Sequence, residues 1–347
     1  MINNKITLQG TPLTGKVMRT FPTVVFCLLF LMCPFQCFGG DEWWEGVCKK
    51  AEKIQLPAKD RPDTETAKSL NGCKSEDLYY GFGNTPDPVK ARYCAYLEMD
   101  QEDSFVFGGS STLMMIYANG KGVKKNVDFA VKFACKLEGA PAEMEYRIQH
   151  LLDLKSNKSS KPFDLCDDIT SGFMQGHCAS RDQRFTDAKL KRSLDSVLVN
   201  WSEKDKQMFT ILKQSFGKFS EARVRNEVDT TGTGRAAFQI EEESTLSEDF
   251  VDSVVQFEKG KLPRYAQADF IKADRDLNTT YGKIQSKRDF NWGSVKQVDI
   301  KHTQRVWLKS REAWVTFGLQ KYPQVSEDSW RIWLTNKRIV MLKEFLN

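Results

Sequence analysis

The chain has 347 residues, of which 40% are hydrophobic and 28% charged, and its formal net charge is +5. This length exceeds a single ordinary hydrophobic core, and the composition excludes a disordered chain. The small net charge argues against a dedicated nucleic-acid binder, which would carry a concentrated basic face. We therefore expect a globular protein of two or three domains that does not bind nucleic acid.

The first forty residues, 1–40, predict a secretory signal peptide. Lys16 and Arg19 precede a short apolar run over residues 23–40 that ends in two glycines. A positive start, an apolar run of this length and small residues are typical of an export signal. We expect cleavage near Gly39 or Gly40 and a periplasmic or secreted mature chain. An uncleaved anchor and a start at Met18 are the alternatives.

Six of the nine cysteines lie beyond this leader. An even number of cysteines in an exported chain predicts disulfides. Cys166 and Cys178 flank a Ser-Gly turn and should pair, with Cys135 as an alternative partner. Gly83 lies midway between Cys73 and Cys94, so a helical hairpin turning there should bring that pair together. Cys48 and Cys135 would then remain for each other.

Residues 41–160 contain a weak internal repeat. The stretch 78–95 can be laid on the stretch 116–135, and each predicts a helix, a glycine-containing turn and a second helix. The matched pairs are Gly83 with Gly122 and Ala91 with Ala130. The segment "YANGKGVKKNVDFAVKFA" resembles the Sel-type repeats, which are relatives of the tetratricopeptide class. That resemblance implies an α-hairpin solenoid that contacts other proteins.

From Cys166 onward the pattern predicts mostly amphipathic helices, and the chain is expected to be all-α. A capping pattern at Ser247 predicts a helix start, and Gly260 predicts its end. We expect one small helical module over 161–255 and another over 256–347.

The two expected modules share a second repeat. Asp187 matches Asp274, Phe219 matches Trp307 and Arg223 matches Arg311. Two antiparallel helices packing through Leu277, Tyr281 and Trp307 would bring Asp274 to Arg311, and Asp187 would meet Arg223 in the same way. Four unconnected, solvated charges are the alternative.

The motifs of this repeat resemble the LprI-type lysozyme inhibitor family. They are "YAQADFIKADRDLNTTYGKI", "QRVWLKSREAW" and "LTNKRIVMLKEF". The family positions are Asp274, Leu277, Asn278, Tyr281, Gln304, Trp307, Arg311, Leu334, Thr335 and Arg338. The resemblance implies an exported, non-enzymatic binding protein that inhibits lysozyme through protein–protein contact. The first module departs from the family in lacking the Gln-x-x-Trp motif.

The second module also departs from the family pattern, because Val315 and Trp330 stand where the family has two cysteines. If the fold is kept, these two side chains should touch in place of the missing covalent bond. They flank a loop expected over 316–329, marked by a glycine and a proline. The candidates for contact with a partner at its tip are Lys321, Tyr322 and Gln324.

No catalytic, metal or cofactor site is predicted. His177 and Cys178 are adjacent and would point apart on a helix, and no Cys-x-x-Cys pair is present. From Ile271 onward Lys and Arg outnumber Asp and Glu by about 15 to 8. A basic module would favour an anionic glycan, lipid headgroups or an acidic protein, rather than a basic lysozyme. A peptidoglycan-active envelope enzyme and a structural envelope scaffold are the alternative functions.

Overall fold

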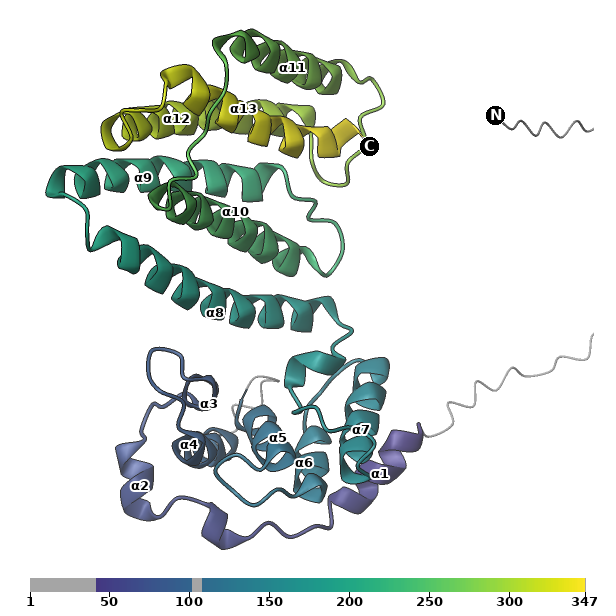
Figure 1. The fold of residues 1–347 in the computed structure, drawn as a ribbon. Coiled ribbons are helices and arrows are strands. Elements are labelled where there is room, and N and C mark those ends of the chain that lie inside the picture. Colours follow the sequence, from purple (N-terminus) through teal and green to yellow (C-terminus); the bar gives the residue numbers. More distant parts are fainter. Residues whose placement is uncertain (1–41, 102–107, 347) are drawn as a thin grey trace, which may run out of the picture. The chain divides into compact units, whose positions relative to one another are not determined.

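The computed structural model describes residues 42–101 and 108–346, and these form helices and no strand (Figure 1). The all-α expectation is confirmed, whereas the expected signal peptide lies outside the described residues. None of the helices described is long and apolar enough to cross a membrane. The α-helices are α1 Trp43–Ala51, α2 Thr64–Ser69, α3 Ser75–Tyr80, α4 Pro88–Asp100, α5 Gly109–Asn119, α6 Val127–Ala134, α7 Pro141–Lys155, α8 Gly172–Leu198, α9 Glu203–Asn226, α10 Arg235–Glu258, α11 Gln267–Ser286, α12 Gln297–Lys321 and α13 Glu327–Lys343. Three short 3₁₀ helices are η1 Ala58–Asp60, η2 Leu165–Asp168 and η3 Glu344–Leu346.

The N-terminal helices contain two hairpins with the same backbone geometry. In α3–α4 and in α5–α6 the turn includes a glycine with positive φ, +81° at Gly83 and +68° at Gly122. Ala91 and Ala130 are both fully buried, as the repeat requires for close helix packing. The turn hydrogen bonds recur as well, because Asp87 N donates to Leu78 O and Asn126 N to Tyr117 O. The internal repeat is present, and a solenoid remains a prediction.

The six helices from α8 to α13 form two equivalent groups of three. α8 packs along α10, α11 packs along α13 in the same way, and α9 packs on α12 (Figure 1). We call α8–α10 the first module and α11–α13 the second module. Residue numbers differ by 88 between buried positions of α9–α10 and their equivalents in α12–α13. The buried pairs are Leu212 and Ile300, Phe219 and Trp307, Leu246 and Leu334, Val251 and Ile339, and Val254 and Leu342.

Two hydrophobic clusters organise the described chain. The first gathers buried side chains from Ala51 to Met174, and the second gathers those from Leu190 to Phe345. The second cluster draws on both modules, so a tandem pair sharing one core describes this region better than two separate bundles.

A short glycine motif sets the approach of α8 to α10. Gly172 and Gly176 lie one turn apart at the start of α8. A Cβ at Gly172 would come within 2.2 Å of the Thr233 carbonyl carbon, and one at Gly176 would lie 3.1 Å from Ala236 Cβ. The absence of both side chains is what lets the two helices lie this close.

Two expected boundaries are wrong. Helix α10 begins at Arg235, so Ser247 lies inside it rather than at its start, because the apolar stripe continues upstream to Ala237. Helix α12 continues to Lys321, so the expected loop over 316–329 shrinks to the few residues before Glu327. Gly318 lies inside this helix, and its missing side chain makes room for the Trp330 indole, which a Cβ would approach to 2.4 Å.

Candidate functional site

The two expected aspartate–arginine pairs do not form. Asp274 is exposed and accepts a hydrogen bond from Asn278 Nδ2 at 3.0 Å. Arg311 instead pairs with Glu312 and lies over the Trp307 ring, 5.2 Å from its centroid. In the second module the aspartate is therefore exposed to solvent and the arginine has another partner.

Arg223 does not pair with Asp187 because three glutamates surround it. Its Nε donates to Glu242 at 2.6 Å, and its two terminal nitrogens donate to Glu227 at 2.9 Å and Glu344 at 2.8 Å. Burial would lower the pKa of Arg223, but Glu227 and Glu242 outweigh it and raise that pKa. Burial, followed by the nearby charge of Glu243, raises the pKa of the Asp187 carboxyl.

The family-motif arginine Arg338 completes this buried network. Both terminal nitrogens donate to Glu227, at 2.6 and 2.8 Å, and its Nε donates to Gln304 Oε1 at 2.8 Å. The side chains of Arg338 and Glu227 are fully buried. We call Arg223, Glu227, Arg338 and Gln304 the central ion network. This network links residues of both modules, so we expect it to stabilise their packing.

The remaining motif residues are mostly core. Leu277, Trp307, Leu334 and Thr335 are buried, and Tyr281 packs partly buried against the second cluster. Val315 and Trp330 are both buried in that cluster, and their direct contact stays a prediction. The motif thus describes how the second module is built.

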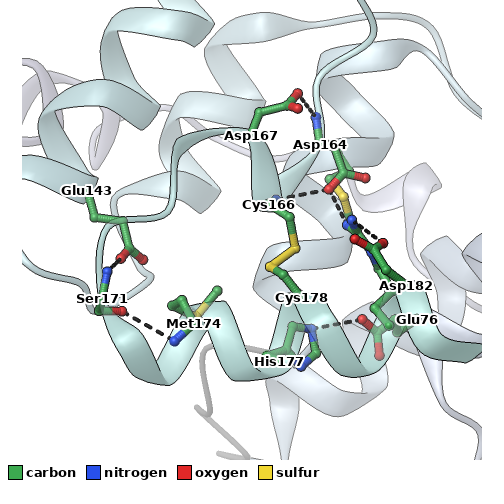
Figure 2. Close-up of a disulfide and its surroundings, with 12 residues drawn as sticks. Glu76, Glu143, Asp164, Cys166, Asp167, Ser171, Met174, His177, Cys178 and Asp182 are labelled. Atoms are coloured by element: carbon green, nitrogen blue, oxygen red, sulfur yellow. Dashed lines mark hydrogen bonds and ion pairs between the residues drawn. A yellow bond between two sulfur atoms is a disulfide. The ribbon is translucent and has the colours of Figure 1, made fainter. Parts of the chain in front are cut away.

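Figure 2 shows the junction at which η2 meets the start of α8. The structure pairs Cys166 with Cys178, and it also pairs Cys73 with Cys94 and Cys48 with Cys135. These are the pairings expected from the sequence. Among the described residues every disulfide therefore lies before residue 179.

Charged side chains reinforce the junction around the disulfide. Arg181 pairs with Asp164, and His177 Nε2 lies 3.0 Å from Glu76 (Figure 2). Glu143, fully buried, accepts hydrogen bonds from the backbone nitrogens of Thr170 and Ser171 at 3.2 Å just before α8. The histidine beside Cys178 is thus paired with a glutamate, while the cysteine is held in a disulfide.

A surface groove opens in the first module, and no sequence pattern predicted it. It holds about 690 Å³ between α8, α9 and α10 and continues into a second hollow of about 390 Å³. Phe216, Gly217 and Ser247 line both parts. Apolar lining residues include Leu190, Leu194, Leu198, Phe209, Phe250 and Val251. We call this the first-module groove.

One glycine lines both parts of this groove and leaves space beside it. Gly217 lies on α9, and a Cβ there would meet nothing within 4 Å. At the equivalent position, 88 residues later, the second module carries Arg305. A sequence reader could have noticed this glycine inside an otherwise regular helix, since glycine disfavours helix interiors.

Several carboxylates line the groove, Asp187 and Asp195 in one part and Glu221 and Glu243 in the other, and after burial the nearby charge of Glu243 also raises the pKa of Asp187. Asp187 and Asp195 are eight residues apart on α8, which corresponds to roughly 12 Å. Asp195 also pairs with Lys191. Within the described residues no group of three or more metal-ligating side chains converges.

The expected partner contacts at the end of α12 are only partly exposed. Tyr322 is buried and donates to Glu258 at 2.7 Å, so the expectation that it is an exposed contact is wrong. Lys321 lies 3.4 Å from Asp205 and over the Trp201 ring at 4.6 Å. Gln324 is exposed, and its role in binding stays a prediction. The longer α12 explains the difference, because it packs these side chains against α9 and α10.

Comparison with known proteins returned no match. No family model, no curated protein and no solved structure is similar to this chain.

Proposed function

We propose that this protein is an exported, non-enzymatic binding protein of the cell envelope, and that it binds a partner protein through the first-module groove. The motif resemblance to the LprI-type family suggests lysozyme as that partner. The resemblance to Sel-type repeats adds a second protein contact through the N-terminal hairpins. Three disulfides support an oxidising compartment, since they are rare in reducing ones.

The observation that carries the proposal is the open apolar groove. A groove bounded by two helices and floored by a third can receive a helix or loop from a partner, with apolar side chains as anchors. Lys206 and Lys213 at its edge and Asp187 along its wall offer charges that would fix the orientation of a partner. The second module carries Arg305 at the position equivalent to Gly217, so the shared fold does not require a glycine there.

Filling the groove tests the proposal. Gly217→Arg places in the first module the residue that the second module has, and the site has room for it. Replacing a helical glycine should keep or raise stability, by up to about 1 kcal/mol. We expect the variant to lose retention of lysozyme in a pull-down, and to lose any inhibition of lysozyme turnover on cell walls.

Gly282→Arg is the matched control. Gly282 is exposed on α11 and also has nothing within 4 Å of a Cβ, so the chemical change is the same at a distance from the groove. If both variants bind lysozyme equally well, the groove is not the binding site. If the wild-type chain neither retains nor inhibits lysozyme, lysozyme is excluded as the partner. Purified peptidoglycan in parallel separates the alternatives, because an enzyme would release soluble fragments and a scaffold would only be retained.

A further inference from the structure

One exposed face of α12 concentrates positive charge. Lys301, Arg305 and Lys309 are spaced four residues apart and are all exposed. Side chains at this spacing stack along one side of a helix, about 6 Å apart. Val298, 63% exposed, and Leu308, 39% exposed, lie on the same side. We call these five residues the basic face.

The three cations of the basic face have no counter-charge in the described structure. None of them forms an ion pair there, whereas neighbouring cations of the second module do. Arg311 and Arg331 share Glu312, and Lys337 pairs with Asp249. Arg305 affects the phenol of Tyr281 on α11, whose pKa is raised chiefly by burial and lowered slightly by this arginine. The charge of the basic face is therefore available to an external anion.

The first module shows that the fold does not require these cations. The equivalents of Lys301, Arg305 and Lys309, 88 residues earlier on α9, are Lys213, Gly217 and Glu221. The same helix, packed in the same way, thus carries no net charge at these places. The difference between the modules has no explanation in packing.

We propose that the basic face binds the surface of a bilayer that contains anionic phospholipids. Lysine and arginine near such a surface each contribute about fivefold to binding. The exposed aliphatic side chains among the cations favour lipid over an acidic protein or a soluble polymer, because they can enter the headgroup region. Binding there is peripheral and does not involve the first-module groove, so this proposal is independent of the proposed function.

Vesicle co-sedimentation tests the proposal on the chain from Glu42 onward, which contains both hydrophobic clusters. The probes are vesicles of phosphatidylcholine alone and vesicles with about one third phosphatidylglycerol. We expect binding only to the anionic vesicles, weakening as salt is raised. The triple variant Lys301→Gln, Arg305→Gln, Lys309→Gln should bind about 100-fold more weakly.

The control variant removes the same charge elsewhere. Lys204 and Lys218 on α9 and Lys259 just after α10 are exposed and lie outside the first-module groove, and replacing all three by Gln should change vesicle binding by only a few fold. Unchanged melting of both variants, followed by circular dichroism, shows that they are folded. Equal vesicle binding by the triple variant and the wild type overturns the proposal. So does a wild type that binds soluble polyphosphate but not vesicles, which would assign the face to an acidic polymer.

Discussion

Glu227 is the residue on which the central ion network depends. It is the carboxylate shared by Arg223 and Arg338, and its side chain is fully buried. Removing one partner of a buried ion pair leaves an uncompensated charge, which typically costs about 3–5 kcal/mol. We predict that Glu227→Gln lowers the free energy of unfolding by that amount, measured by urea denaturation.

An exposed pair provides the comparison for that measurement. Glu221 pairs with Arg225 on the surface of α9, four residues apart. Exposed pairs of this kind contribute about 0.3–0.5 kcal/mol. A loss as small for Glu227→Gln as for Glu221→Gln would mean that the network is solvated rather than buried.

Asp229 should make stability depend on acid pH. Its carboxylate accepts hydrogen bonds from the backbone nitrogens of Thr231 and Ser294, and these hydrogen bonds lower its pKa to about 2. The unfolded value is about 3.9, so the stabilisation is present above about pH 4 and is lost as the pH falls towards 2. We predict that the melting-temperature difference between wild type and Asp229→Asn shrinks over that interval. A difference that is constant from pH 6 to pH 2 would contradict this assignment.

At the scale of helices, the same substitution should have opposite effects at two glycines. Gly172→Ala drives a methyl group into the Thr233 backbone and should destabilise by about 1–3 kcal/mol. Gly217→Ala meets open space in a helix interior and should stabilise by up to about 1 kcal/mol. Urea denaturation of the two variants checks both signs. A Gly172→Ala variant as stable as the wild type would refute the close α8–α10 packing, and a destabilising Gly217→Ala would refute the open space at Gly217.

Local sequence patterns were enough to predict the helices and hairpins. Contacts between the two modules could not be predicted from such patterns. Gly83 and Ala91 predicted their hairpin because turn conformation and close packing depend on those residue types themselves. The predicted Asp274–Arg311 ion pair was wrong because helix spacing indicates which residues share a face but not which side chains on two helices meet. Glu227 could not be matched to Arg338, because they are 111 residues apart and the repeat places Val315 at the equivalent of Glu227. The first-module groove could not be predicted, because it depends on how α8, α9 and α10 pack together and not on one local pattern.

At the scale of the whole chain, reducing the disulfides should lower the stability of the first hydrophobic cluster and leave that of the second nearly unchanged. The disulfides of the described residues all lie at or before Cys178, and the Cys48–Cys135 loop spans 87 residues. In the chain-entropy model a loop of that length contributes about 4–5 kcal/mol. Six of the eight tryptophans belong to or pack on the second cluster. They are Trp201, Trp292, Trp307, Trp314, Trp330 and Trp333.

Two probes then distinguish the clusters during urea unfolding. With a reductant present, we predict that the midpoint followed by far-ultraviolet circular dichroism falls while the tryptophan-fluorescence midpoint stays nearly unchanged. The reason is that the second cluster contains no disulfide among the described residues. A parallel fall of both midpoints would show instead that the second cluster needs the first.

The order of the disulfides has a consequence for how the chain matures. The Cys73–Cys94 bond lies inside the loop closed by Cys48 and Cys135. If cysteines were oxidised in the order in which they emerge from a translocation channel, Cys48 would first meet Cys73 rather than Cys135. Correct maturation then requires that bond to be reshuffled by a disulfide isomerase, whose loss would lower the yield of the chain. The helices after Cys178 would not depend on the isomerase, because the chain contains no cysteine beyond that residue.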